Sequence, residues 1–221
     1  MISSIADFGE TLKTTFLEKA ITLHDISWQD YKVLQTAIKV ERPRIKMSLC
    51  DRKLKISTVA TMFHERLKST LEGIISVTMM NLQINIVAVG QATLRSAIRQ
   101  IATEPDASYF IQNAASVELK NYVPDELELF PDLVVEIDES HKSDDKFEIY
   151  AAFGIKEFWL YDAEILRIFK LADTGEYLLS KNSLALPILT AEMLTEFLNR
   201  SQRENQFDVL LDFEKWLQEN K

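Results

Sequence analysis

The spacing of apolar residues changes along the chain, and the changes predict a mixture of strands and helices. Residues 44–49 and 53–57 alternate between apolar and polar positions and are separated by Cys50-Asp51-Arg52, which predicts a β-hairpin with one apolar and one basic face. From residue 61 to residue 82 the apolar positions recur at helical spacing instead. The first half of the chain therefore contains both kinds of element.

The rest of the chain repeats this mixture. Strands are expected at residues 84–89, 107–111, 133–137, 157–161, 165–171 and 176–179. Helices are expected at residues 28–40 after the N-cap Ser27, at 144–153 before Gly154 in the C′ position, at 191–200 and at 205–218. This order predicts an α/β or α+β fold in which helices flank a central mixed sheet.

Composition favours one globular domain over residues 1–221, with an N-terminal helical segment at 1–40 and C-terminal helices at 190–221 packed on it. Hydrophobic residues make up 47% of the chain, and five Gly and five Pro leave no linker-like tract. The first residues do not resemble a signal peptide, and no apolar run is long enough to cross a membrane. Together with the single Cys50, this predicts a soluble cytoplasmic protein.

Glu136 is the first residue with candidate chemistry. Alternation in the strand at 133–137 places Leu133, Val135 and Ile137 on one face and Glu136 on the other. An ionised carboxylate inside an apolar strand costs several kcal/mol unless it is paired or binds a metal. A positively charged group should therefore face Glu136, and a structural salt bridge would meet that need as well as a metal.

Two more residues extend this candidate site. Lys146 is in register with Ile149, Tyr150 and Phe153 on the inward stripe of its helix, although a lysine there can also reach past the core to water. Asp106 follows a proline and opens a strand, a position that is also common for plain turn residues. Two carboxylates and a lysine suit metal-assisted phosphodiester hydrolysis, in which Mg²⁺ or Mn²⁺ keeps several waters.

Several stretches resemble the Uma-two family of the PD-(D/E)XK restriction-endonuclease-like superfamily. They are SWQDY at 27–31, EPDASYFIQNA at 104–114, PDLVVEID at 131–138 and DKFEIYAAFGIKEFWLYD at 145–162. The likeness spans nearly the entire chain. It implies a restriction-endonuclease-like core in which Asp106 and Glu136 bind the metal ion and act in catalysis with Lys146.

The resemblance also marks departures and outer residues. The plain motif places its lysine two residues after the glutamate, where this chain has Asp138, so Lys146 matches a lysine displaced onto the next helix and Lys142 is a weaker substitute. His64 resembles a histidine that the family carries on its first core helix, and Glu65 follows it. Both are candidate outer members of the site, although a lone histidine there is more often structural.

Net charge limits how nucleic acid could bind. A formal charge of −9 repels phosphate, so binding requires a local basic patch or a bound cation. Lys55 stands where the family commonly has glutamate, and it enlarges a basic patch on the hairpin. That patch is a candidate phosphate-binding surface or a solvated strand face, and it consists of Arg44, Lys46, Lys53 and Lys55.

The leading hypothesis is therefore a metal-dependent endonuclease acting on DNA, with no organic cofactor and no membrane partner. A non-catalytic binding or assembly protein that keeps the nuclease fold is the alternative, and a nuclease restrained until a partner arrives is a third. The acidic stretch at 112–131 favours the alternatives, because it would repel DNA. A homodimer is expected from the surplus of apolar residues in the last helix, which are Phe207, Leu210, Leu211, Phe213, Trp216 and Leu217.

Overall fold

The structure is a computed structural model that describes residues 20–41, 45–57, 61–117, 128–138, 144–162 and 164–221. The chain divides into two compact units, which are described separately. Unit 1 comprises Met1–Val59 and Arg95–Glu104, and unit 2 comprises Ala60–Leu94 and Pro105–Lys221. A single domain over the whole chain stays a prediction.

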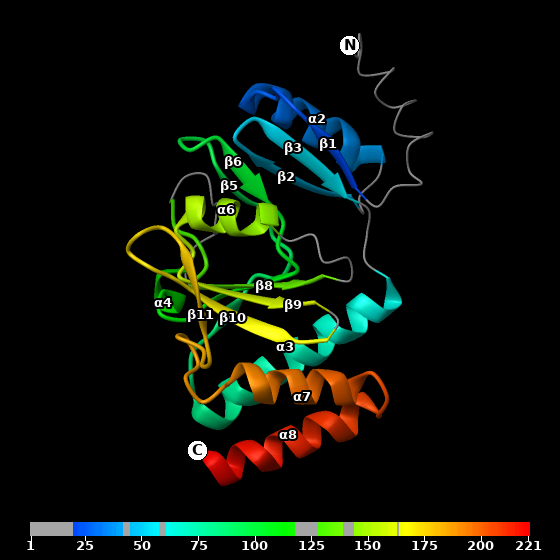
Figure 1. The fold of residues 1–221 in the computed structure, drawn as a ribbon, viewed down its shortest axis with the longest axis vertical. Helices are drawn as coiled ribbons and strands as arrows, with labels where there is room; N and C mark the ends of the chain where they lie inside the picture. The colour runs from blue at the N-terminus through cyan, green and yellow to red at the C-terminus, as the bar shows by residue number, and fades with distance from the viewer. Residues whose placement is uncertain (1–19, 42–44, 58–60, 118–127, 139–143, 163) are drawn as a thin grey trace. The chain divides into compact units, whose positions relative to one another are not determined.

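Unit 1 contains a five-stranded sheet with the order β1-β3-β2-β6-β5 (Figure 1). The strands are β1 (Ala20–Leu23), β2 (Lys46–Cys50), β3 (Lys53–Ser57), β5 (Leu94–Ser96) and β6 (Ile101–Thr103). The predicted hairpin is confirmed: β2 and β3 pair antiparallel around Asp51 and Arg52, which both have positive φ angles, of 46° and 61°. Such angles at both central positions are what a tight two-residue hairpin turn needs.

Helix α2 (Trp28–Glu41) completes unit 1 and begins at the predicted cap. The Ser27 hydroxyl accepts a hydrogen bond from the Asp30 amide, and the Asp30 carboxylate accepts one from the Ser27 amide. Apolar residues of the helix and the sheet form one core, which contains Tyr31, Ile38, Ile45, Met47, Leu49, Leu54, Ile56 and Ala102. Residues 20–23 form strand β1, so the expectation of a helical segment over residues 1–40 was wrong at this strand.

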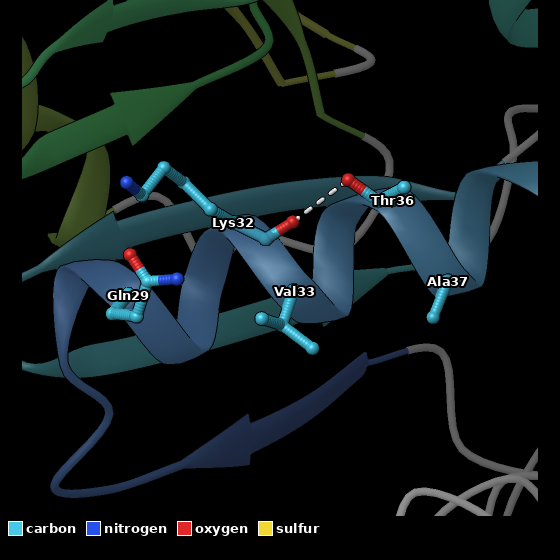
Figure 2. A pocket seen from close by; sticks show the side chains of 5 residues that line it. All are labelled: Gln29, Lys32, Val33, Thr36 and Ala37. Atoms are coloured by element: carbon cyan, nitrogen blue, oxygen red, sulfur yellow. Dashed lines mark hydrogen bonds between the residues drawn. The ribbon is translucent and has the colours of Figure 1, made fainter.

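A shallow apolar pocket lies along the outer side of α2 (Figure 2). Gln29, Lys32, Val33, Thr36 and Ala37 line it, and the Thr36 hydroxyl donates a hydrogen bond to the Lys32 carbonyl within the helix. All five residues come from one helix, and none of them is a candidate site residue. The pocket therefore gives no support to any function expected from the sequence.

Unit 2 contains a six-stranded mixed sheet with the order β11-β10-β9-β8-β7-β4. The strands are β4 (Val87–Ala88), β7 (Ala107–Phe110), β8 (Leu133–Ile137), β9 (Glu157–Tyr161), β10 (Leu166–Leu171) and β11 (Tyr177–Ser180). Strands β8 and β9 are parallel, and the other neighbours are antiparallel. The expected mixed sheet is confirmed, with β8 in its interior between β7 and β9.

Helices cover both faces of this sheet, as Figure 1 shows within unit 2. Helix α6 (Asp144–Phe153) connects β8 to β9 on one face, where Phe147 and Tyr150 contact Phe158. The other face packs with α3 (Met62–Leu82), α7 (Ala191–Ser201) and α8 (Gln206–Asn220) around a large apolar core. The short helix α4 (Ala114–Val117) follows β7. None of the helices in the described parts of the chain is long and apolar enough to cross a bilayer.

The last helix uses most of its apolar residues inside unit 2. Phe213 and Leu217 are fully buried, and Leu210 and Trp216 pack against the same core. Phe207 and Leu211 are 70% and 40% exposed. The surplus from which a homodimer was expected therefore shrinks from six residues to two.

Candidate functional site

Glu136 is a buried carboxylate in the interior of the larger sheet. It lies on β8 and is 4% exposed. Its Oε1 accepts a hydrogen bond from Lys146 Nζ at 2.6 Å and another from the Tyr150 hydroxyl. A positively charged partner for this carboxylate was expected from the strand pattern, and the structure supplies one from helix α6.

Helix α6 brings both donors to Glu136 because they lie four residues apart on one face of the helix. Tyr150 is fully buried and the Lys146 side chain is 22% exposed, so the lysine remains within reach of solvent. Gly154, with a φ of +76°, ends the helix in the predicted C′ position. The inward stripe that includes Lys146 is thus confirmed, and Ile149 and Phe153 occupy its buried remainder.

Asp106 lies just before β7 at a β-bulge. The ladder pairs Ala107 with Val135, and the Asp106 amide also donates to the Val135 carbonyl at 3.1 Å. Two residues of one strand thus oppose one residue of the other, which redirects the side chain of the extra residue. Simple alternation would place Asp106 on the face of Ser108 and Phe110, and the bulge breaks that alternation.

The redirected carboxylate of Asp106 connects helix α3 to strand β8. Its Oδ2 accepts a hydrogen bond from the Ile137 amide at 2.8 Å and lies 3.1 Å from His64 Nε2. Asp106 is 2% exposed. Because Ile137 follows Glu136 directly, the amide held by Asp106 belongs to the residue next to the second carboxylate. Asp106 and Glu136 thus contact different helices, α3 and α6, and Asp106 is joined to β8 through the residue next to Glu136. A shared site of Asp106, Glu136 and Lys146 stays a prediction.

His64 and Glu65 occupy the first turn of α3 after the N-cap Thr61. His64 is buried and its Nδ1 lies 3.5 Å from Glu65 Oε1, while Glu65 is about half exposed and also contacts Lys68. His64 therefore contacts one expected metal ligand directly. Among the described contacts Glu65 touches His64 and Lys68, and its role as an outer member of the site stays a prediction.

Glu72 is a partly buried carboxyl group on the same helix as His64 and Glu65. Glu72 is half-buried on α3, and its pKa is raised mainly by burial and further by the charges of Glu65 and Asp106, while Lys68 opposes the shift. Burial disfavours the ionised form of a carboxyl group, so the shift reports mainly the loss of water around Glu72.

Two other buried carboxylates in unit 2 have structural roles. Asp132 accepts hydrogen bonds from the Ile111 and Asn113 amides and from the Asn113 side chain. Glu157 is fully buried and accepts from the Trp159 indole and from the amides of residues 184 and 185. Backbone and uncharged side-chain donors satisfy these groups. Glu136 differs because an ammonium group and a phenol contact it.

Tyr150 contacts Glu136, a partner that the sequence pattern did not identify. It was assigned only to the inward stripe of its helix and to the family signature, without a role. Its position four residues after Lys146 was the available signal, because that spacing directs both side chains to the same strand. A buried tyrosine hydroxyl needs a hydrogen-bond partner, and the Tyr150 hydroxyl finds one in the Glu136 carboxylate.

Some expected residues belong to the other unit or lie outside the described residues. Lys46, Lys53 and Lys55 belong to unit 1. Arg44 and Lys142 lie outside the described residues, as do residues 118–127 of the acidic stretch.

The side chains at this site suit a magnesium or manganese ion better than a protein-enclosed metal. Among the described residues, no group of three or more His, Cys, Asp or Glu side chains is arranged to hold a metal ion. Asp106 and Glu136 offer two hard oxygen donors, and Mg²⁺ is commonly bound by one or two carboxylates while water and phosphate oxygens complete its shell. The chemistry of these two side chains suits that mode of binding, and a metal ion held by both stays a prediction.

Two solved structures are similar to this chain to different degrees. A solved structure of a "putative nuclease belonging to DUF820" from Anabaena variabilis ATCC 29413 matches with a TM-score of 0.53 and 17% identity, over 78% of this chain and 99% of that chain. The type IIG restriction endonuclease BpuSI matches at a TM-score of 0.36 and 10% identity, over 65% of this chain and 17% of that one. No curated protein matches the chain.

The family comparison covers most of both units. The sequence model of Uma2, described as "Putative restriction endonuclease", matches residues 28–200. That range includes the hairpin of unit 1, helix α3 and the strands and helix that carry Asp106, Glu136 and Lys146. The fold is restriction-endonuclease-like, and the chain belongs to the Uma2 family.

Proposed function

We propose that the protein is a metal-dependent endonuclease that hydrolyses DNA phosphodiester bonds, and that Asp106, Glu136 and Lys146 form its active site. The observation that carries the proposal is the 2.6 Å contact between Lys146 Nζ and Glu136 Oε1, which brings a lysine from a helix to a buried acidic residue of β8. A displaced lysine can serve the nuclease motif only if its helix packs over that strand. The family description supports the nuclease class.

Each residue has a distinct role in this proposal. Asp106 and Glu136 hold the metal ion through carboxylate oxygens, and the ion, when bound, lowers the pKa of a water and offsets negative charge on the phosphate. Lys146, which retains some exposure to solvent, orients the attacking water or stabilises the charge that develops on the phosphate oxygens. Tyr150 and His64 position the two carboxylates from the sides of α6 and α3.

Nicking of supercoiled plasmid DNA tests the proposal. The purified protein should cut in the presence of Mg²⁺ or Mn²⁺, and cutting should fall at least about 100-fold in Asp106→Ala and Lys146→Ala proteins that remain folded. Asp173→Ala and Lys156→Ala remove the same groups from exposed positions of unit 2 and should cut normally. Retained cutting by folded Asp106→Ala and Lys146→Ala proteins would refute the assignment.

A non-catalytic binding or assembly protein is the second candidate. The observation that favours it is that both carboxylates already have protein partners: Glu136 contacts Lys146 and Tyr150, and Asp106 contacts the Ile137 amide and His64. Such a protein would show no carboxylate-dependent binding of Mg²⁺ or Mn²⁺ in calorimetry. Binding that disappears in Asp106→Asn protein would instead favour the nuclease.

The proposal includes a homodimer, which would supply two sites for two DNA strands. Its remaining support is the exposure of Phe207 and Leu211 on α8. Light scattering of the intact protein should give twice the mass of the chain, and Phe207→Ser with Leu211→Ser should give monomers. A monomeric parent protein would reject the dimer without affecting the assignment of the site.

A further inference from the structure

Charge is distributed unequally between the two units. Unit 1 contains twelve Lys and Arg and eight Asp and Glu, which gives a formal charge of +4. Unit 2 contains thirteen Lys and Arg and twenty-six Asp and Glu, which gives −13. The net charge of −9 is therefore the sum of a positively charged unit 1 and a negatively charged unit 2. The repulsion of nucleic acid inferred from the whole chain does not apply to unit 1.

The basic residues of unit 1 include three lysines that share one face of its sheet. In β2 and β3 every second residue is buried against α2, so Lys46, Lys53 and Lys55 occupy the opposite face. Hydroxyl groups lie between them, because Ser48 and Thr22 are the partners of Lys55 in the two neighbouring strands and Ser57 is the partner of Lys46. Strands β1, β2 and β3 contain no Asp or Glu.

We propose that this lysine and hydroxyl face, consisting of Thr22, Lys46, Ser48, Lys53, Lys55 and Ser57, binds the phosphodiester backbone of duplex DNA. Lys, Ser and Thr side chains are among the usual donors to phosphate oxygens, and such contacts fix the position of a protein on DNA without reading its sequence. The choice of DNA as the ligand rests on the proposed function. The face attracts the polyanion, and the reaction belongs to the carboxylates of unit 2.

The strength of binding should depend on salt in proportion to the number of lysines involved. Each phosphate that a lysine neutralises releases condensed counterions, so the slope of log K against log salt changes by about one for each lysine removed. We expect the triple change of Lys46, Lys53 and Lys55 to Gln to reduce that slope by about three and to weaken binding at least about tenfold at moderate salt.

Fluorescence anisotropy of a labelled DNA duplex with the full-length protein tests this inference, with EDTA present so that binding is measured without cleavage. The matched control replaces Lys32, Lys156 and Lys181 with Gln, which changes net charge by the same amount at exposed residues that are not part of this face. The face triple should weaken binding and lower the salt slope, and the control triple should bind like the parent protein. If the face triple does not fold, the exposed Lys53→Gln alone should lower the slope by about one.

Equal weakening by both triples would show that only total charge matters and would overturn the inference, as would unchanged binding by the face triple. These results are separate from the nicking assay. A parent protein that binds DNA through this face but never nicks it refutes the proposed function alone. A parent protein that nicks DNA while the face triple binds normally refutes the docking face alone.

Discussion

Lys146 Nζ lies 2.6 Å from Glu136 Oε1 across the interface between helix α6 and strand β8, ten residues apart in the chain. The Glu136 carboxylate is 4% exposed. Removal of the Lys146 ammonium group would therefore leave a buried negative charge, and the Tyr150 hydroxyl would be the other donor described from α6. The contact therefore affects stability as well as the proposed chemistry. Unfolding measurements and nicking assays on separate variants distinguish these two effects.

We expect Lys146→Met to lower the free energy of unfolding by roughly 2 kcal/mol, less than the loss for a fully buried pair, because the lysine retains some solvent contact. Glu136→Gln should relieve most of that loss in the double variant, because no buried charge then lacks a partner. Urea unfolding of both single variants and the double variant measures the coupling. Additive effects of the two changes would show that the contact contributes nothing to stability.

Tyr150→Phe should weaken both stability and metal binding. Loss of one hydrogen bond to a charged group costs about 2 kcal/mol, and loss of a residue that orients a metal ligand lowers metal affinity roughly tenfold or more. Tyr177→Phe is the matched control, because it removes a hydroxyl that donates to the Ile155 carbonyl in the same unit. Calorimetry should find normal Mg²⁺ affinity in Tyr177→Phe, and normal affinity in Tyr150→Phe would remove its positioning role.

His64→Ala should lower metal affinity and nicking roughly tenfold, because His64 Nε2 orients the Asp106 carboxylate at 3.1 Å. His64→Gln, which retains a side-chain donor, should restore part of the loss. His24→Ala changes an exposed histidine of unit 1 and should have no effect. If the His64→Ala protein is folded and binds the metal normally, His64 is a structural residue.

Glu157→Ala should destabilise the protein without changing the chemistry of the site. The substitution leaves the Trp159 indole and two backbone amides without their acceptor, which costs about 3 kcal/mol or more. Thermal unfolding should show the loss, and nicking per folded molecule should stay within about twofold of the parent. A specific loss of nicking in folded Glu157→Ala protein would mean that this carboxylate belongs to the site.

The raised pKa of Glu72 predicts a pH-dependent stability. Burial first, and then Glu65 and Asp106, hold its folded pKa above the ordinary value of 4.5, so the folded state binds more protons than the unfolded state between these two pKa values. Stability from this group is therefore lost as pH rises through that window. Glu72→Gln should stabilise the protein at pH 7 and lose this advantage below pH 4.5.

Urea unfolding at pH 7 and at pH 4 measures the effect of Glu72→Gln. Glu176→Gln changes an exposed glutamate of the turn before β11 and should leave stability the same at both pH values. A Glu72→Gln protein that gains nothing at pH 7 would show that burial does not penalise the ionised carboxylate. The comparison requires no assumption about enzyme activity.

Local sequence patterns were sufficient where an element is long and periodic. The bounds expected for α6, β8 and β9 match the structure. As predicted, Ser27 precedes α2 as its cap, Gly154 ends α6, and the turn at Asp51 and Arg52 connects β2 to β3. In each case the signal lies within a few neighbouring residues. The strand of three residues at Ile101–Thr103 gave no such signal, because alternation cannot be recognised over so short a span.

The sequence by itself determined which residues carry charge into apolar elements: Glu136 in a strand and Lys146 on an inward helical face. Only the tertiary structure decided the partners. The β2–β6 pairing that builds a second sheet, the bulge that turns Asp106 toward Ile137 and His64, and the approach of Tyr150 to Glu136 all join residues distant in the chain. Spacing fixes the face on which a side chain lies, whereas a contact depends on how two elements pack, which no local pattern encodes.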